Sequence, residues 1–293
     1  MPFFLETLVG GLLAGILYSM VAIGFVLIYK ASGVFNFAQG AMLLFAALTF
    51  VSLTERGYSF LAAFVLTLAT MVLIAVLIER WLLRPLVARS PITLFMATLG
   101  LSYILEGVAQ ALWGADVHGL ELGIDDVPFD LGGVSVSRFD LVAAGTAGVL
   151  VLGLSLLANR SRLGLSLRAV ADDPRAALSL GVRLPVIWRY VWSLAGVVGL
   201  IAGLLWGARS GVQFSLSLVV LKAMPVLVIG GFDSIAGALV GGLIVGASEK
   251  LAEVYIGGVV GGGIENWFPY VLAIASLMAR PAGLFGERAI ERV

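Results

Sequence analysis

The sequence contains no cysteine, one histidine and few charged residues, and each shortage excludes a class of protein. Without cysteine the chain can form no disulfide, thiolate metal site or cysteine nucleophile. The one histidine, His118, lies in a polar connecting segment, so a histidine-based metal cluster or proton relay is not expected. Charged residues make up 12% of the chain, against roughly 25% in soluble domains, which is too few to cover a soluble globule.

Hydrophobic residues take the place of the missing charge: they form 60% of the 293 residues, and the mean hydropathy is +1.07. The apolar runs are continuous, as in Leu8–Tyr29, which has no charged side chain. About 20 such residues in a helix cross the hydrocarbon core of a bilayer, whereas barrel strands alternate apolar and polar residues. The sequence therefore predicts an all-α polytopic membrane protein.

The charge-poor windows predict eight or nine transmembrane helices. The count depends on residues 31–40, where Gly33, Asn36 and Gln39 interrupt the apolar sequence and predict a broken or re-entrant segment. The candidate spans lie near residues 8–29, 34–53, 59–80, 92–113, 138–158, 187–208, 215–230, 235–256 and 265–279.

Lys and Arg collect in two connections, near residues 80–89 and in Asn159–Leu184, and recur at the C-terminus from Arg280 onwards. Residues 115–137 instead carry five acidic and no basic side chains. Because cytoplasmic loops are enriched in Lys and Arg, the basic connections and the C-terminus are expected in the cytoplasm and residues 115–137 outside. Nine spans then place the N-terminus outside, and eight place it inside.

The basic connection is predicted to contain a short helix of its own. Asp173 and Pro174 are suited to the N-cap and first helical position, and Gly181 to the C′ position. Between them lies a compact apolar face, given by Ala176, Ala177, Leu178 and Leu180. Such a helix is either a docking element for a partner or an amphipathic connector that lies on the lipid surface.

Sequence patterns for catalysis are absent: the chain has no P-loop, no GxSxG and no HExxH motif. We therefore expect no catalytic residue, no metal site and no enzyme activity, and the net charge of zero argues against binding to nucleic acid. Glu106 and Lys222 are charged residues inside predicted spans. They are expected to pair within the bundle, with contact to substrate as the alternative.

Two short segments place polar side chains and glycine beside apolar spans, one in each half of the chain. Irregular backbone at membrane depth is tolerated where protein or a watery cavity covers it, so both segments are candidates for a substrate path or gate. An interhelical hydrogen bond is the alternative for Asn36 and Gln39. The candidate path residues are Asn36, Phe37, Gln39, Gly40, Gly230, Gly231, Asp233 and Ser234.

Several motifs follow one another in a fixed order over essentially the whole chain. They are Gly15–Gly24 with Gly33–Gly40, Glu79-Arg80 with Arg84-Pro85-Leu86, Ser161–Gly164 with Asp172 and Ala177–Gly181, Lys222-Ala223 with Gly230-Gly231 and Gly237-Ala238, and Pro281–Gly286. This series resembles the permeases of branched-chain amino acid ABC transporters, and more closely the first of their two permease types.

The resemblance implies one permease domain over residues 1–293 in a bacterial inner membrane. It also implies four partners: a second permease subunit, two cytoplasmic ATPase subunits that bind the ATP, and a periplasmic substrate-binding protein. The cargo would be branched-chain amino acids or similar small polar solutes, and the permease would hold no cofactor of its own. The implied ATPase coupling residues are Arg168, Asp172, Asp173, Arg175, Ala176, Ala177 and Gly181.

A different function class is a self-sufficient secondary transporter or channel for a small solute such as urea or an amide. That class would be favoured by a set of carboxylates within the spans that could bind H⁺ or Na⁺. The predicted spans offer few.

Overall fold

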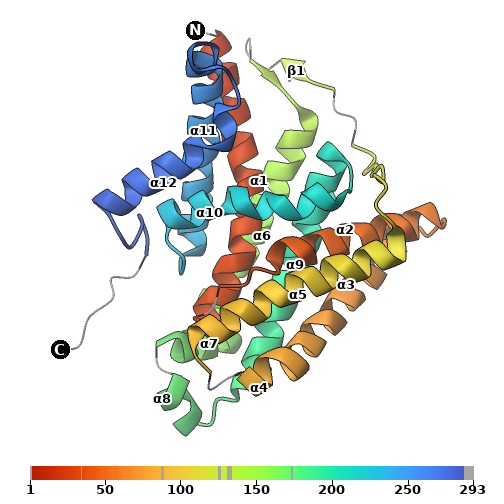
Figure 1. Ribbon diagram of the computed structural model, residues 1–293, viewed down its shortest axis with the longest axis vertical. Helices are drawn as coiled ribbons and strands as arrows, with labels where there is room; N and C mark the ends of the chain where they lie inside the picture. Colours follow the sequence, from red (N-terminus) through yellow and green to blue (C-terminus); the bar gives the residue numbers. More distant parts are fainter. Residues whose placement is uncertain are drawn as a thin grey trace. The chain divides into compact units, whose positions relative to one another are not determined.

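A computed structural model describes residues 2–33, 35–86, 89–124, 127–130, 134–172 and 174–286. These residues are mainly helical, and their two short strands form one antiparallel pair in which Phe129 lies opposite Val136. The expected all-α architecture is therefore confirmed (Figure 1).

Most of the described residues lie in helices, apart from the described part of the segment between Trp113 and Arg138. Short helical turns of other geometry interrupt the helices: a π-helical turn at Ile78–Leu83, and 3₁₀ turns at Phe214–Leu218 and Ile264–Asn266. The elements are α1 (Pro2–Ser32), α2 (Gln39–Glu55), α3 (Phe60–Leu77), α4 (Arg84–Leu86), α5 (Pro91–Trp113), β1 (Phe129–Asp130), β2 (Ser135–Val136), α6 (Arg138–Arg160), α7 (Arg162–Asp172), α8 (Pro174–Ser179), α9 (Leu184–Ser210), α10 (Val219–Gly230), α11 (Ile235–Val260) and α12 (Phe268–Ala279).

Among the residues that the structure describes, six helices are long and apolar enough to cross a membrane. They are α1, the continuous helix Phe60–Leu86, α5, α6, α9 and α11. Three apolar helices are shorter: α2, Phe214–Gly230 and α12. Every predicted span falls on one of these nine helices. The number of crossings, eight or nine, stays a prediction, because it depends on how the three shorter helices lie in the bilayer.

The chain divides into two compact units. One comprises Met1–Val26, Gly123–Leu152 and Leu221–Val293, and the other comprises Leu27–Leu122 and Gly153–Val220. The first unit thus joins the two ends of the sequence, and boundaries between the units fall inside α1, α6 and α10 and between Leu122 and Gly123. The expectation of one permease domain over residues 1–293 stays a prediction.

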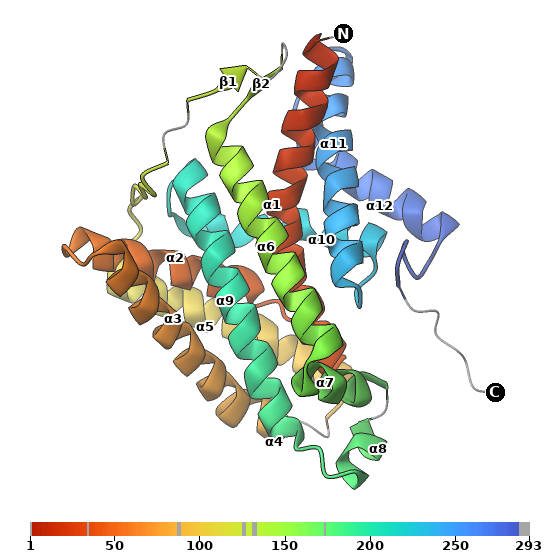
Figure 2. The same ribbon diagram turned by 180° about the vertical axis from the view of Figure 1, so that it is seen from behind.

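In the first unit, α1 and α11 pack with their backbones in contact, and Figures 1 and 2 show the two helices side by side from opposite directions. Glycines make the approach possible. A Cβ atom added at Gly15 would overlap the carbonyl oxygen of Gly242, and one added at Gly246 would overlap the carbonyl oxygen of Gly11. These are the small-xxx-small spacings that allow helix backbones to meet in lipid.

In the second unit, α2 packs against α3, α5 and α9, and α9 also packs against α3. Nearly every side chain of α2 is buried, although α2 is one of the shorter apolar helices. The close approach of α9 again uses glycine: a Cβ at Gly203 would lie 2.7 Å from the carbonyl oxygen of Leu43. The unit is therefore built around α2, which follows directly on the predicted broken segment.

Candidate translocation and coupling sites

A glycine turn and an asparagine side chain form the break between α1 and α2. Gly33 follows the end of α1 with a φ of +65°, in the left-handed region that favours glycine. The Asn36 Oδ1 accepts a hydrogen bond from the Ala38 N–H at 3.1 Å, and the Asn36 carbonyl accepts one from the Gln39 N–H at 3.2 Å. The first amides of α2 are thereby satisfied locally. The predicted interruption is confirmed.

The two polar side chains of this break are fully buried, since Asn36 and Gln39 are both 0% exposed. The Asn36 Nδ2 donates to the Gln39 Oε1 at 3.3 Å, and the Gln39 Nε2 donates to the carbonyl of Ala195 on α9 at 3.3 Å. These contacts are the interhelical hydrogen bond given above as the alternative for the pair. A role of Asn36 and Gln39 in the substrate path stays a prediction.

Phe37 lies in an aromatic cluster next to these residues. Its ring centroid is 4.8 Å from that of Phe35 and 4.7 Å from that of Phe95, which it meets edge to face. On the following turn, a Cβ added at Gly40 would overlap the carbonyl oxygen of Ser217. Phe37 and Gly40 therefore serve packing in this structure, and their part in a gate stays a prediction.

The second candidate segment, residues 230–234, is a tight main-chain joint. A Cβ at Gly230 would overlap the carbonyl oxygen of Gly237. Gly231 has a φ of +107°, and a Cβ there would lie 2.6 Å from the backbone nitrogen of Gly286. The C-terminal segment is hydrogen-bonded to the end of α10, because the Phe285 N–H donates to the Gly230 carbonyl at 3.0 Å. Two motifs far apart in the sequence thus form one joint.

The polar residues of the joint lie at the start of α11. Ser234 is its N-cap, and its hydroxyl accepts a hydrogen bond from the Gly237 N–H at 3.0 Å. The Asp233 carboxylate lies beside Gly286, whose added Cβ would be 3.4 Å from the Asp233 Oδ1. The observed contacts of this segment are therefore structural, and its assignment to the path stays a prediction.

The basic connection forms two helices, α7 and α8, where the sequence predicted one short helix. α8 begins at Pro174 as expected, and Gly181 follows it with a φ of +85°. The Gly181 N–H donates to the Leu178 carbonyl at 3.0 Å, and the Val182 N–H donates to the Ala177 carbonyl at 3.0 Å. These two bonds form a Schellman motif, so the C′ role of Gly181 is confirmed. The proposed N-cap, Asp173, lies outside the described residues.

The exposed face of α8 differs from the prediction. Ala177 was placed on the apolar face offered to a partner, but its side chain is 1% exposed and packs within the chain. Leu178 and Leu180 are the exposed apolar residues, at 51% and 82%. Ala176 is also exposed and Arg168 is half-buried, whereas the side chains of Asp172 and Arg175 lie outside the described set. Of the predicted apolar face, Ala177 is therefore buried while Ala176, Leu178 and Leu180 are exposed, and the docking role of this face stays a prediction.

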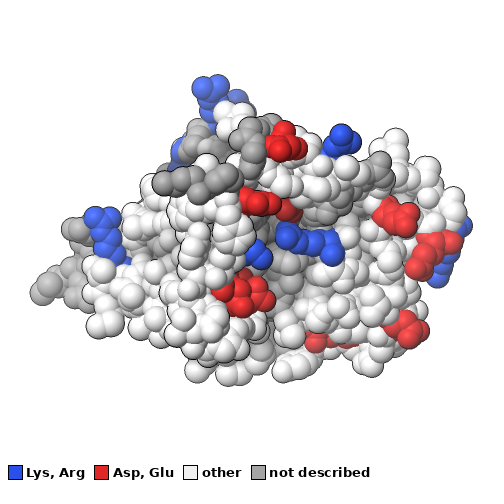
Figure 3. Space-filling model, turned by 90° about the horizontal axis from the view of Figure 1, so that it is seen from above, with Lys and Arg blue, Asp and Glu red and all other residues white. Residues whose placement is uncertain are grey.

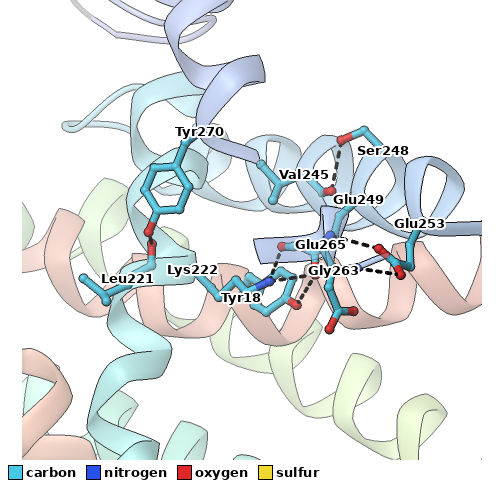
Figure 4. Close-up of polar contacts among 10 residues, drawn as sticks. All are labelled: Tyr18, Leu221, Lys222, Val245, Ser248, Glu249, Glu253, Gly263, Glu265 and Tyr270. Carbon is cyan, nitrogen blue, oxygen red and sulfur yellow. Dashed lines mark hydrogen bonds and ion pairs between the residues drawn. The ribbon is translucent and has the colours of Figure 1, made fainter. Parts of the chain in front are cut away.

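A partly buried ion pair connects three helices of the first unit (Figure 4). The Lys222 Nζ on α10 lies 3.0 Å from the Glu249 Oε1 on α11, and the Tyr18 hydroxyl on α1 donates to the same oxygen at 3.0 Å. The Lys222 Nζ also lies 5.9 Å from the centre of the Tyr18 ring. The expectation that Lys222 pairs within the bundle is confirmed. Glu106, on α5, is half-buried.

A short segment after α11, Gly261–Asn266, covers this ion pair, and we call it the strap. The Lys222 Nζ donates a short hydrogen bond to the main-chain carbonyl of Glu265 in the strap. Glu253, one turn after Glu249 on α11, accepts hydrogen bonds from the Gly263 and Glu265 N–H groups, both at 3.2 Å. Three consecutive glycines with positive φ, Gly261–Gly263, turn the chain back for these contacts.

Comparison with known proteins places the chain in a family of transport permeases. Residues 7–279 match the family described as "Branched-chain amino acid transport system / permease component". The chain belongs to this family of permeases. The resemblance inferred from the sequence motifs is thereby confirmed.

Individual relatives match the permease over nearly its whole length. The high-affinity branched-chain amino acid transport system permease protein BraD of Pseudomonas aeruginosa is 28% identical over 99% of this chain and 98% of its own. LivH of Escherichia coli K12, a permease protein of the same description, is 25% identical with the same coverage. The probable LivH of Methanocaldococcus jannaschii is 28% identical over 94% of this chain and 91% of its own.

One solved structure shares the fold of the permease. PsaBC from Streptococcus pneumoniae in complex with Fab matches with a TM-score of 0.50 and covers 96% of this chain and 94% of its own. The identity is 15%, so this likeness supports the fold alone.

The permease contains two buried carboxylates that the sequence analysis did not place among the site residues. Glu249 is followed by Lys250, and the adjacent opposite charges resemble an exposed helix surface more than a buried pair.

Glu79 is 1% exposed, with the Arg84 Nη2 at 3.1 Å and the Arg189 Nε at 3.4 Å. The sequence feature that could have pointed to a buried Glu79 is the motif that it shares with Arg84. Its contact with Arg189 ties the end of α3 to the first turns of α9.

Charged side chains are few on the permease surface. On the face that Figure 3 draws, most of the described residues are uncharged. The exposed residues of α5 and α6 include large apolar side chains, as expected of helices that face lipid. These are Tyr103, Ile104, Val149 and Leu152.

Proposed function

We propose that this permease is a membrane subunit of an ATP-driven importer, and that it passes branched-chain amino acids or similar small polar solutes from a periplasmic binding protein to the cytoplasm. The observation that carries the proposal is the family match over residues 7–279. It is supported by relatives from three organisms that are named for this transport and match more than nine-tenths of the chain.

The proposed importer divides its work among several chains. The sequence has no P-loop of its own, so the ATP is bound and hydrolysed by two cytoplasmic ATPase subunits, and a second permease subunit completes the membrane pathway. The paired helices α7 and α8 support this division, since they present Leu178 and Leu180 to solvent in the most basic connection of the chain. The permease itself binds no cofactor.

The function test is reconstitution of the permease with its partner subunits in liposomes. Leucine uptake is expected to require both ATP and the binding protein. The Leu178→Ala/Leu180→Ala variant should retain its ATPase at least tenfold less well and lose uptake, because burial of one leucine contributes about 1.5–3 kcal/mol. Leu152→Ala, at an exposed position of α6, is the matched control and should behave as wild type. ATP-independent uptake that persists without the ATPase subunits would instead favour a self-sufficient transporter.

The proposed orientation places α7 and α8 in the cytoplasm, residues 115–137 in the periplasm and the C-terminus inside the cell. It rests on the distribution of Arg and of acidic residues. A membrane-impermeant thiol reagent added to intact cells should label Gly119→Cys, which is exposed, and should label Ser166→Cys on α7 only after lysis. The chain has no native cysteine, so unmodified protein gives the background. The reverse labelling pattern would contradict the orientation.

A further inference from the structure

The Lys222–Glu249 pair lies where a charge is expensive. Both residues belong to apolar helices, and the Glu249 side chain is 7% exposed. A charge in a helix that crosses a membrane is costly, and two well-packed apolar side chains could replace such a pair without loss of stability. Packing alone therefore does not explain an ion pair at this position. A ligand that is bound by both charges would explain it.

The pair is incompletely satisfied. The Glu249 Oε1 accepts from Lys222 and from Tyr18, but the Oε2 of the same carboxylate is buried without a hydrogen-bond partner. A buried, unpartnered carboxylate oxygen is costly, and its natural partner is a cationic donor. Glu249 thus has a vacant acceptor position directly beside the Lys222 ammonium.

The second hydrogen bond of the Lys222 ammonium goes to a neutral acceptor that a charged ligand could replace. The Lys222 side chain is 23% exposed, and this acceptor is a main-chain carbonyl of the strap, at Glu265. The strap is kept in place by the two N–H groups that Glu253 accepts, and both bonds are exposed. Release of these bonds would free Lys222 for a stronger, charged acceptor, because charge-assisted hydrogen bonds are about twice as strong as neutral ones.

We propose that Lys222 and Glu249 bind the zwitterionic head group of the transported amino acid. The inference rests on the proposed function and names the part of the permease that recognises the solute. The solute carboxylate replaces the Glu265 carbonyl on the Lys222 Nζ, and the solute ammonium takes the vacant position at the Glu249 Oε2. The strap lifts to admit the head group, and no covalent bond changes.

Charge balance selects the zwitterion over singly charged solutes. When an ammonium and a carboxylate arrive together, the Lys222–Glu249 pair stays intact and the site gains one positive and one negative charge, each beside an opposite charge of the protein. An amine alone would add an uncompensated positive charge to the site, and a carboxylate alone would add an uncompensated negative charge, which is costly in apolar surroundings.

The test measures solute binding to the permease without its binding protein. The purified permease–ATPase complex in lipid nanodiscs is titrated with leucine to its solubility limit while its thermal midpoint is recorded. We expect a rise of about 5 °C or more at a hundredfold excess over Kd. Isopentylamine and 4-methylpentanoate, which have the leucine skeleton without the carboxylate or without the ammonium, should give no rise. A rise of equal size with either compound, or none with leucine, would overturn the proposal.

A double variant separates binding from folding. Lys222→Met/Glu249→Met replaces the pair by apolar side chains and should assemble normally while losing the leucine response and at least 90% of uptake. Lys250→Met, which removes an exposed lysine next to Glu249, is the matched control and should keep both. Wild-type leucine response and uptake in the double variant would refute this inference alone. Absence of ATP-dependent leucine uptake by the wild-type importer would instead refute the proposed function.

Discussion

Replacement of Glu249 by alanine is expected to destabilise the folded permease by about 3–5 kcal/mol, the range found when one partner of a buried ion pair is removed. The variant would leave the Lys222 ammonium inside an apolar unit with the Glu265 carbonyl as its main remaining acceptor. It would also remove the acceptor of the Tyr18 hydroxyl. The measurement is reversible unfolding of the purified permease in bicelles, followed as the free energy of unfolding.

Two further variants decide the cause of that loss. Lys250→Ala changes the neighbouring exposed residue and should alter the free energy by less than about 0.5 kcal/mol. Lys222→Met/Glu249→Met removes both charges and should recover most of the stability, because no buried charge is left uncompensated. If the double variant were as unstable as Glu249→Ala, the loss would come from packing around Glu249 and not from an unpaired lysine.

The sequence predicted the helices of this permease well, because the signals for a helix are local. Continuous apolar runs located all nine apolar helices, and Gly33 with Asn36 located the break before α2. Pro174 and Gly181 located the two ends of α8. Each of these predictions depends on residues within a few positions of one another, where helix propensity and capping act.

The contacts between helices could not be predicted in the same way. Lys222 and Glu249 are on different helices, and nothing in the periodicity of either helix says which neighbour it meets. The hydrogen bond from Phe285 to Gly230 likewise joins two distant motifs that the sequence analysis treated separately. The composition of a short helix also does not reveal which residues of its apolar face are buried, as Ala177 is, and which are exposed, as Leu178 is. Tertiary proximity, unlike helix formation, is not encoded within a short window.

The glycines of α1 show that residue type alone does not reveal a contact between helices. Their substitution also gives the second large effect that we expect on stability. Gly10, Gly11 and Gly15 are indistinguishable by residue type, but their surroundings differ. Nothing lies within 4 Å of a Cβ added at Gly10, whereas one added at Gly11 would be 2.8 Å from the Gly246 carbonyl oxygen. At Gly15 the added atom would overlap the Gly242 carbonyl oxygen. The backbone of α11 cannot move aside as a flexible side chain could.

Gly15→Leu is therefore expected to force α1 and α11 apart and to destabilise the permease by about 3 kcal/mol, at the upper end of the range for overpacked cores. Separation of the helices would also remove Tyr18 from Glu249, so the leucine response should fall with stability. Gly10→Leu, with the same change of volume one and a half turns away on the same helix, should remain within about 0.5 kcal/mol of wild type. Equal free energies of unfolding for the two leucine variants would show that α1 and α11 do not meet through their backbones in the membrane.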